Sequence, residues 1–186
     1  MSTENFLNPD CKLIPKCVNI PLELYESTLG KYFIGYADNL KFGNGTSTWA
    51  RLYNPPFSGV ILHVNVWTVT DISNYPFRAQ FWFNADPPGN PIDSDNVTTT
   101  NLAIRPLPQP KVKMQLASNV YGEPTGGIKA FVRRGEPGTT VVETENGKLI
   151  FPPGGSFLVF MSLDGAQTAS AEGRIAFGWY EEKIIK

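Results

Sequence analysis

The side chains that could carry out catalysis are few and scattered in this sequence. His63 is the only histidine and stands mid-run between aliphatic neighbours, which is more typical of a structural or surface role. A Cys17–His63 dyad matches no family signature, and no Gly-x-Ser-x-Gly motif presents a serine nucleophile. The acidic residues fall mostly in predicted turns, which favours solvated loop carboxylates over a glycosidase pair. They include Asp38, Asp71, Asp86, Asp93, Asp95, Glu143 and Glu145. We therefore expect no catalytic residue and no enzyme.

Signals for a cofactor or a metal are equally weak. Asp93-Ser94-Asp95 begins like a calcium loop but lacks the following Asp/Asn-Gly and the distal Glu. Gly43-Asn44-Gly45 and Gly126-Gly127 lack the Lys-Ser/Thr ending of a phosphate-binding loop. A cupin-type metal centre usually draws on several histidines. The sequence predicts no metal site and no cofactor.

The two cysteines, Cys11 and Cys17, both lie near the N-terminus. In a reducing compartment they would remain free thiols. The alternative is a local or intermolecular disulfide formed after release of the protein from the cell.

Aromatic residues give the best indication of binding. We predict that Trp67 and Trp82 lie on the more polar faces of two adjacent strands. Their polar neighbours there would be His63, Asn65, Arg78 and Gln80. Exposed aromatic rings flanked by planar polar groups can stack on sugars or form a protein contact surface. The alternative is that a second sheet, the N-terminal arm or a neighbouring subunit covers these rings.

The elements that would position these residues are short strands with alternating side chains. The core face of residues 60–70 is expected to hold Val60, Leu62, Val64, Val66 and Thr68. The other face is expected to hold Ile61, His63, Asn65, Trp67 and Val69. In residues 77–84 the expected core face holds Phe77, Ala79, Phe81 and Phe83.

Further strands, turns and one short helix follow from the same kind of pattern. We predict strands that begin at residue 32 and cover residues 46–53, 97–104, 111–116, 128–133, 139–143, 156–162 and 173–181. Asn44-Gly45 and Asn146-Gly147 are typical of hairpin turns because both residue types tolerate positive φ. Residues 22–29 could form a helix that Gly30 would end.

Nine or ten strands with almost no helix predict an all-β, two-sheet antiparallel jelly-roll or β-sandwich. Residues 31–186 would form this domain. Residues 1–30 would form an extended N-terminal arm, because Pro9, Pro15 and Pro21 discourage helix.

The charge composition indicates which classes of partner can be expected. The 16 basic and 17 acidic residues give a net charge of −1 and form no long block of either sign. We therefore expect no nucleic-acid or anionic-membrane footprint over the chain, and little repulsion against self-association. The first nine residues lack a secretory signal and residues 60–69 are too short to span a bilayer. Synthesis in the cytoplasm without a membrane span is expected.

Several stretches resemble an uncharacterised β-sandwich family of small proteins from spore-forming Gram-positive bacteria. Their pattern of a strand, Asn-Pro and a further strand, and of Pro-Pro-Gly-Gly followed by a strand, is also similar to that of jelly-roll subunits of phage and virus particles. The resemblance covers roughly residues 30 to 181 and implies no catalytic residue. It implies a β-sandwich of unassigned activity that is a spore or particle component. The matching stretches are Gly30-Lys31-Tyr32-Phe33-Ile34-Gly35, Tyr53-Asn54-Pro55-Pro56, Val64-Asn65-Val66-Trp67-Thr68-Val69, Phe151-Pro152-Pro153-Gly154-Gly155 and Ala176-Phe177-Gly178-Trp179.

These observations favour a non-catalytic structural or assembly protein. It would be a subunit of a homo-oligomer or pack with other proteins on a spore or particle surface, and the arm would add a strand to a neighbour's sheet edge. The alternative is a module that binds carbohydrate or another surface ligand. An enzyme ranks last.

Overall fold

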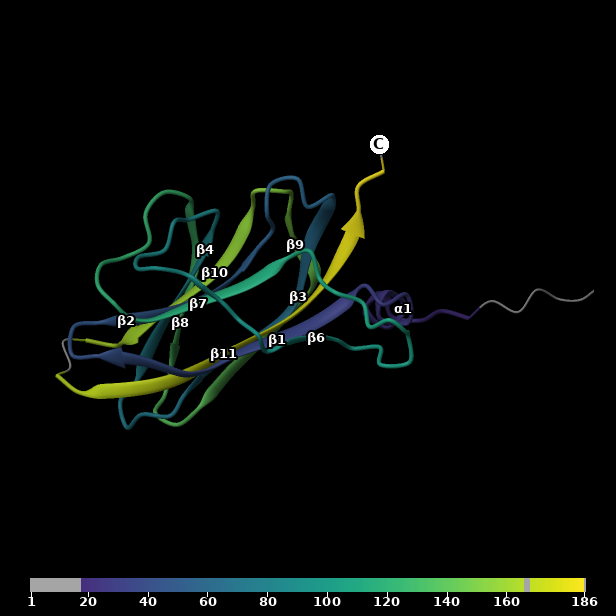
Figure 1. Cartoon of the computed structure of the whole chain (residues 1–186). Coiled ribbons are helices and arrows are strands. Elements are labelled where there is room, and N and C mark those ends of the chain that lie inside the picture. Colours follow the sequence, from purple (N-terminus) through teal and green to yellow (C-terminus); the bar gives the residue numbers. More distant parts are fainter. Residues whose placement is uncertain (1–17, 166–167, 186) are drawn as a thin grey trace, which may run out of the picture.

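The computed structural model describes residues 18–165 and 168–185, and it consists mainly of antiparallel strands arranged in two sheets (Figure 1). Residues 1–17, with Cys11 and Cys17, lie outside the described residues. The five-stranded sheet has the order β6 (Val97–Thr99), β1 (Tyr32–Gly43), β11 (Ser170–Lys183), β3 (Val60–Asp71) and β9 (Thr140–Phe151). The six-stranded sheet has the order β5 (Ile92–Asp93), β7 (Lys113–Val120), β2 (Ser47–Tyr53), β10 (Ser156–Leu163), β4 (Phe77–Phe83) and β8 (Ile128–Gly135).

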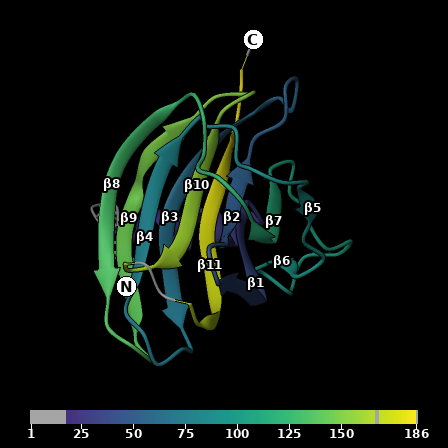
Figure 2. The ribbon, with the colours of Figure 1, turned by 90° about the vertical axis from the view of Figure 1, so that its left-hand side faces the viewer.

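The strand pairing is nested, as in a jelly roll. β1 pairs with β11, β2 with β10, β3 with β9, and β4 with β8, all antiparallel. Successive members of this series alternate between the two sheets, so the chain crosses the sandwich repeatedly. Figure 2 shows β8 and β9 at one side of the two layers and β5 and β6 at the other. The predicted fold class, an antiparallel β-sandwich, is confirmed.

The core lies between the sheets and consists of the inward side chains of both layers. Phe77, Ala79 and Phe81 of β4 are fully buried there, as the alternation in residues 77–84 predicted. Ile175, Phe177 and Trp179 of β11 face them from the other sheet. The alternate apolar positions of these strands therefore form one common interior.

The alternation predicted for β3 is wrong beyond Asn65. Leu62 and Val64 are buried as expected, but Trp67 and Val69 then turn inward while Val66 and Thr68 are only partly buried. Both neighbouring strands shift register at this level, β11 between Gly178 and Trp179 and β9 between its partners of Val64 and Val66. A β-bulge at Asn65 adds one residue and exchanges the two faces of the strand.

The outer face of the six-stranded sheet is covered by the chain's own connections. Residues 84–91 cross it on the way from β4 to β5, and residues 121–127 return across it to β8. Asp86 and Thr125 join the two crossings through paired backbone hydrogen bonds. Beneath them lies a second apolar cluster of Trp49, Trp82, Ala85, Ala117, Val120, Leu158 and Phe160.

Local elements follow the predictions in part. Helix α1 (Leu22–Thr28) forms, and Gly30 ends it at φ +69°. Asn44-Gly45 makes the turn between β1 and β2. Asn146-Gly147 forms no hairpin turn, because both residues take positive φ inside the unbroken β9, where they belong to the bulged stretch. β6 is shorter than predicted and ends at Thr99, where Asn101 starts a side-chain-stabilised turn.

The bulge at Asn65 leads to a prediction about the two valines that flank it, Val64 and Val66. Val64→Ala should lower the free energy of unfolding by about 1.5–2 kcal/mol, because it removes buried methyl groups. Val66→Ala removes the same groups from the outer side and should cost about 0.5 kcal/mol or less. Urea unfolding of both variants measures the difference. Equal costs would contradict the exchange of faces.

Candidate functional site

The outer face of the five-stranded sheet carries two neighbouring rows of uncharged side chains. One row, in register across the sheet, consists of Thr98, Ile34, Gly178, Val66 and Thr144. The next consists of Tyr36, Ala176, Thr68 and Val142. Ile34 is 46%, Tyr36 50% and Val142 58% exposed. An antiparallel sheet usually presents polar residues on the face that it turns to water, so this face differs from the rest of the surface.

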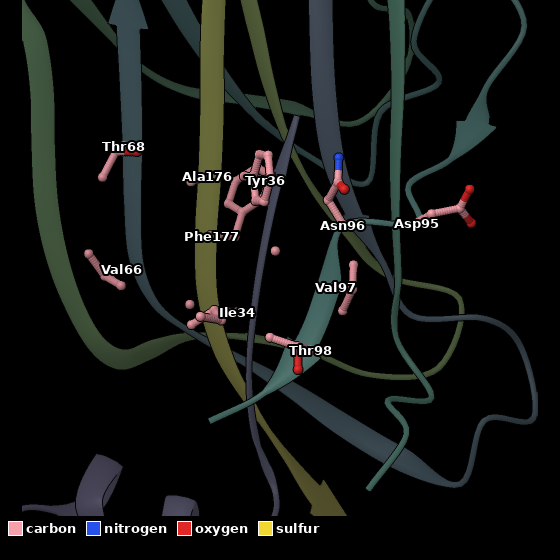
Figure 3. A pocket seen from close by; sticks show the side chains of 12 residues that line it. Ile34, Tyr36, Val66, Thr68, Asp95, Asn96, Val97, Thr98, Ala176 and Phe177 are labelled. Carbon is pink, nitrogen blue, oxygen red and sulfur yellow. The ribbon is translucent and has the colours of Figure 1, made fainter. Parts of the chain in front are cut away.

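The small residues Ala176 and Gly178 of the central strand form the floor of a hollow of about 510 Å³ in this face (Figure 3). Ile34 and Tyr36 stand on one side of it and Val66 and Thr68 on the other. The segment that leads into β6 closes a further side with Asp95, Asn96, Val97 and Thr98. The hollow is therefore apolar at its base, with the polar residues Asn96 and Thr98 along one rim, while the Asp95 carboxylate points away from it (Figure 3). We name the two rows together with this hollow the outer apolar face.

The outer apolar face has polar borders at both ends of the strands. On one side Arg174 donates to Asp38 at 2.6 Å (Nε to Oδ1), and this hydrogen bond lowers the pKa of Asp38. On the other side the ring of Tyr180 stacks on that of His63 with centroids 4.5 Å apart, and the Asn65 amide donates to the Tyr32 hydroxyl at 2.9 Å. Burial is the main cause that raises the pKa of Tyr32.

The six residues predicted to form one binding platform are divided among three places. Trp67 lies in the core, fully buried against Phe81 with ring centroids 4.3 Å apart. His63 and Asn65 lie at the border of the outer apolar face. Arg78, Gln80 and Trp82 belong to the other sheet. The predicted adjacency is wrong because consecutive strands β3 and β4 lie in different sheets. Ligand binding by these residues remains a prediction without the shared face on which it depended.

Trp82 is part of the covered cluster on the six-stranded sheet. It is 9% exposed, donates through Nε1 to Oε1 of Gln80 at 3.2 Å, and has the Lys129 ammonium 4.6 Å from its ring centroid. The Gln80 amide in turn donates to Glu123 at 3.2 Å, which with Lys129 lowers the pKa of Glu123. The polar neighbours of Trp82 therefore satisfy one another beneath the crossing segments.

His63 lies between two hydrogen-bond acceptors. Its Nδ1 lies 3.2 Å from the carbonyl oxygen of Gly147, which can only accept, and its Nε2 lies 3.0 Å from Oε2 of Glu182. Each ring nitrogen therefore has an oxygen atom within hydrogen-bond distance. With both nitrogens engaged and the ring stacked on Tyr180, His63 joins β3, β9 and β11 rather than offering a free base.

The most buried carboxylates are also engaged in structure. Glu145 accepts from the Trp67 indole at 3.1 Å and pairs with Lys148 at 3.2 Å. Glu181 accepts from the backbone N–H groups of Lys111 and Val112 and from the Trp179 indole. Within residues 18–165 and 168–185 no group of three or more His, Cys, Asp and Glu side chains is placed to hold a metal ion. In the same residues no helix is long and apolar enough to cross a membrane.

The outer apolar face was not predicted from the sequence, although a signal for it exists. Residues 32–36 and 175–179 lack charge at every position, so both faces of those strands are uncharged. A strand with only one buried face would be expected to carry charged or strongly polar residues on the other.

Glu181 gives a pH-dependent prediction. Burial raises its pKa above the ordinary 4.5, an effect that the hydrogen bonds only partly offset. The folded state therefore binds this proton more tightly than the unfolded state, and the resulting stabilisation is present below pH 4.5 and lost as the pH rises through the folded pKa. We expect wild-type stability to increase relative to Glu181→Gln as the pH falls from about 7 towards 4.5. Urea unfolding of both proteins at several pH values tests this, and a constant difference would contradict it.

Comparisons with known proteins give one match. Neither the curated proteins nor the solved structures contain a match to this chain. A family model described as a family of unknown function, DUF6143, matches residues 4–186. The match includes both sheets, the outer apolar face and most of the N-terminal segment. The chain therefore belongs to the DUF6143 family.

Proposed function

We propose that this protein is a non-catalytic assembly subunit that associates with further copies of itself through the outer apolar face. The observation that carries the proposal is the contrast between the sheets. Two chain crossings cover the outer face of the six-stranded sheet, while two rows of uncharged side chains remain open on the five-stranded sheet. Contiguous exposed apolar patches on soluble proteins mark interaction sites.

A second copy suits this face better than a charged partner does. The rows contain no charged residue, so a strongly charged partner would lose hydration without gaining an ion pair. The net charge of −1 adds almost no repulsion between copies. Threonine and valine side chains on a flat sheet also pack well against the same kind of surface.

The size of the face indicates how strong the contact is. Five strands about 4.8 Å apart, over the length of the two rows and their flanks, give roughly 400 Å² on each copy. Stable interfaces bury about 800 Å² on each partner. We therefore propose a contact that depends on protein concentration, with a spore or particle surface as a setting in which copies would be concentrated.

Charge placed in the outer apolar face should abolish self-association. Tyr36→Lys and Val142→Lys each bring like charges together when two copies meet, so we expect monomers at concentrations where the wild type shows a larger mass. Sedimentation velocity over a concentration series measures this.

The matched control is Val132→Lys, which changes an exposed valine on the six-stranded sheet. It should associate as the wild type does. A wild type that stays monomeric at its highest soluble concentration, or a control that is equally impaired, would refute the proposal.

The hollow supports a second candidate, a site for a small carbohydrate. Its volume of about 510 Å³ lies in the range of ligand pockets. The half-exposed ring of Tyr36 beside the Asn96 amide combines an aromatic surface with a planar polar group, the chemistry for stacking a sugar. This replaces the tryptophan platform that the sequence suggested.

A glycan array distinguishes the two candidates. If the hollow binds a sugar, Tyr36→Ala should lose the signal, while Tyr121→Ala, a substitution of another exposed tyrosine, should keep it. Absence of any glycan signal from folded wild-type protein would remove this candidate and leave self-association untouched.

A further inference from the structure

Residues 18–29, which include α1, carry an unusual density of exposed apolar side chains. Six of the 21 large apolar side chains that are exposed in the described part of the chain lie within this short segment. α1 buries none of its side chains, and a helix this short depends on packing for most of its stability. We name this segment the apolar connector. Its exposed apolar residues are Val18, Ile20, Leu22, Leu24, Tyr25 and Leu29.

The apolar connector lies beside the outer apolar face. α1 packs against β1 and β11, and Figure 1 shows it next to the start of β1. Tyr32 and Tyr180 are paired in register two residues beyond the pair Ile34 and Gly178, so they form the next outward row of the sheet. Burial, and after it the negative charge of Glu26, raise the pKa of Tyr180, as expected if α1 stands over this row. The connector and the outer apolar face therefore adjoin.

The connector is held away from the outer apolar face of its own molecule. The hydroxyl groups of Ser27 and Thr100 form a hydrogen bond of 2.8 Å, and the Asn101 amide donates to the Thr28 carbonyl at 3.2 Å. Gly30, which ends the helix, lies so close to the segment after β6 that a Cβ atom would be 2.8 Å from Ile104 and from Pro108. With α1 fixed at this place its apolar side chains stay exposed, so a cover for them must come from another molecule.

A second copy of the chain offers a surface that suits the connector. The outer apolar face supplies roughly 400 Å² on each copy, about half of what a stable interface buries. The exposed side chains of the connector are of the same apolar kind and adjoin that face, so they extend the surface available for one contact. When two such faces meet, each connector stands at the border of its own face and therefore reaches the face opposite. A contact of this kind is isologous and closes with two copies.

We propose that the apolar connector of each copy packs on the outer apolar face of a second copy, so that two equivalent connector–face contacts complete a dimer. The inference rests on the proposed self-association and names the segment that covers the open face. A short helix with apolar side chains laid on an apolar hollow is a common mode of recognition. The floor of small residues, Ala176 and Gly178, leaves room in the hollow of about 510 Å³ for a large side chain such as Tyr25.

The double variant Leu22→Gln/Tyr25→Gln tests the connector. The two residues are three apart in α1 and share one side of it, and glutamine is polar but favours helix. Because α1 buries no side chain, the urea midpoint of dilute protein should not change. Sedimentation velocity of the full chain should show self-association at least about tenfold weaker than in the wild type.

The matched control is Tyr121→Gln/Ile128→Gln. It changes an exposed tyrosine and an exposed isoleucine on the six-stranded sheet and its crossing segment. This variant should associate as the wild type does, because neither residue belongs to the connector or to the outer apolar face.

Mixing two impaired variants tests whether the connector contacts the face of the other copy. Leu22→Gln/Tyr25→Gln keeps an intact outer apolar face, and Tyr36→Lys keeps an intact connector. A mixed dimer therefore retains one of the two contacts, whereas a dimer of either variant alone retains neither. Sedimentation with one variant fluorescently labelled should show association of the mixture at concentrations at which each variant alone is monomeric.

The outcomes separate this inference from the proposed function. A wild type that associates together with an unimpaired Leu22→Gln/Tyr25→Gln variant overturns the connector contact and leaves self-association standing. A mixture that stays monomeric, or a control as impaired as the connector variant, also overturns the connector contact. A wild type that stays monomeric at its highest soluble concentration overturns both. Rescue in the mixture supports the exchange of connectors between copies.

Discussion

The bulge at Asn65 is the constraint on which both faces of the five-stranded sheet depend. Strict alternation along β3 would place Val66 in the core and Trp67 outside. The additional residue instead brings Trp67 against Phe81 and Phe131, and leaves Val66 and Thr68 outside. β11 accommodates the shift at Gly178, where a Cβ atom would lie 2.6 Å from the Tyr32 hydroxyl and 2.8 Å from Val66. The missing side chain at Gly178 in turn deepens the hollow between Ile34 and Val66.

The two sheets differ in what covers the apolar side chains on their outer faces. The six-stranded sheet buries Trp49 and Trp82 beneath its own crossing segments, and the Trp49 indole donates to the Pro88 carbonyl at 2.7 Å. That face is complete within one molecule. Apolar residues on the outer apolar face have no such cover among the described residues, so their burial requires a partner. The difference between intramolecular and intermolecular burial is what makes one face structural and the other a candidate interface.

The sequence was sufficient for the fold class and insufficient for the site. Alternation in residues 77–84 identified inward residues correctly, because β4 itself is regular: the register shift between β4 and β8 at Phe81 and Trp82 places its extra residue in β8. It failed at Trp67 because a bulge changes the parity of a strand without leaving a recognisable residue pattern. The prediction also placed Trp67 beside Trp82, because it assigned the consecutive strands β3 and β4 to one sheet. The nested pairing of a jelly roll separates them, and that pairing depends on contacts distant in sequence.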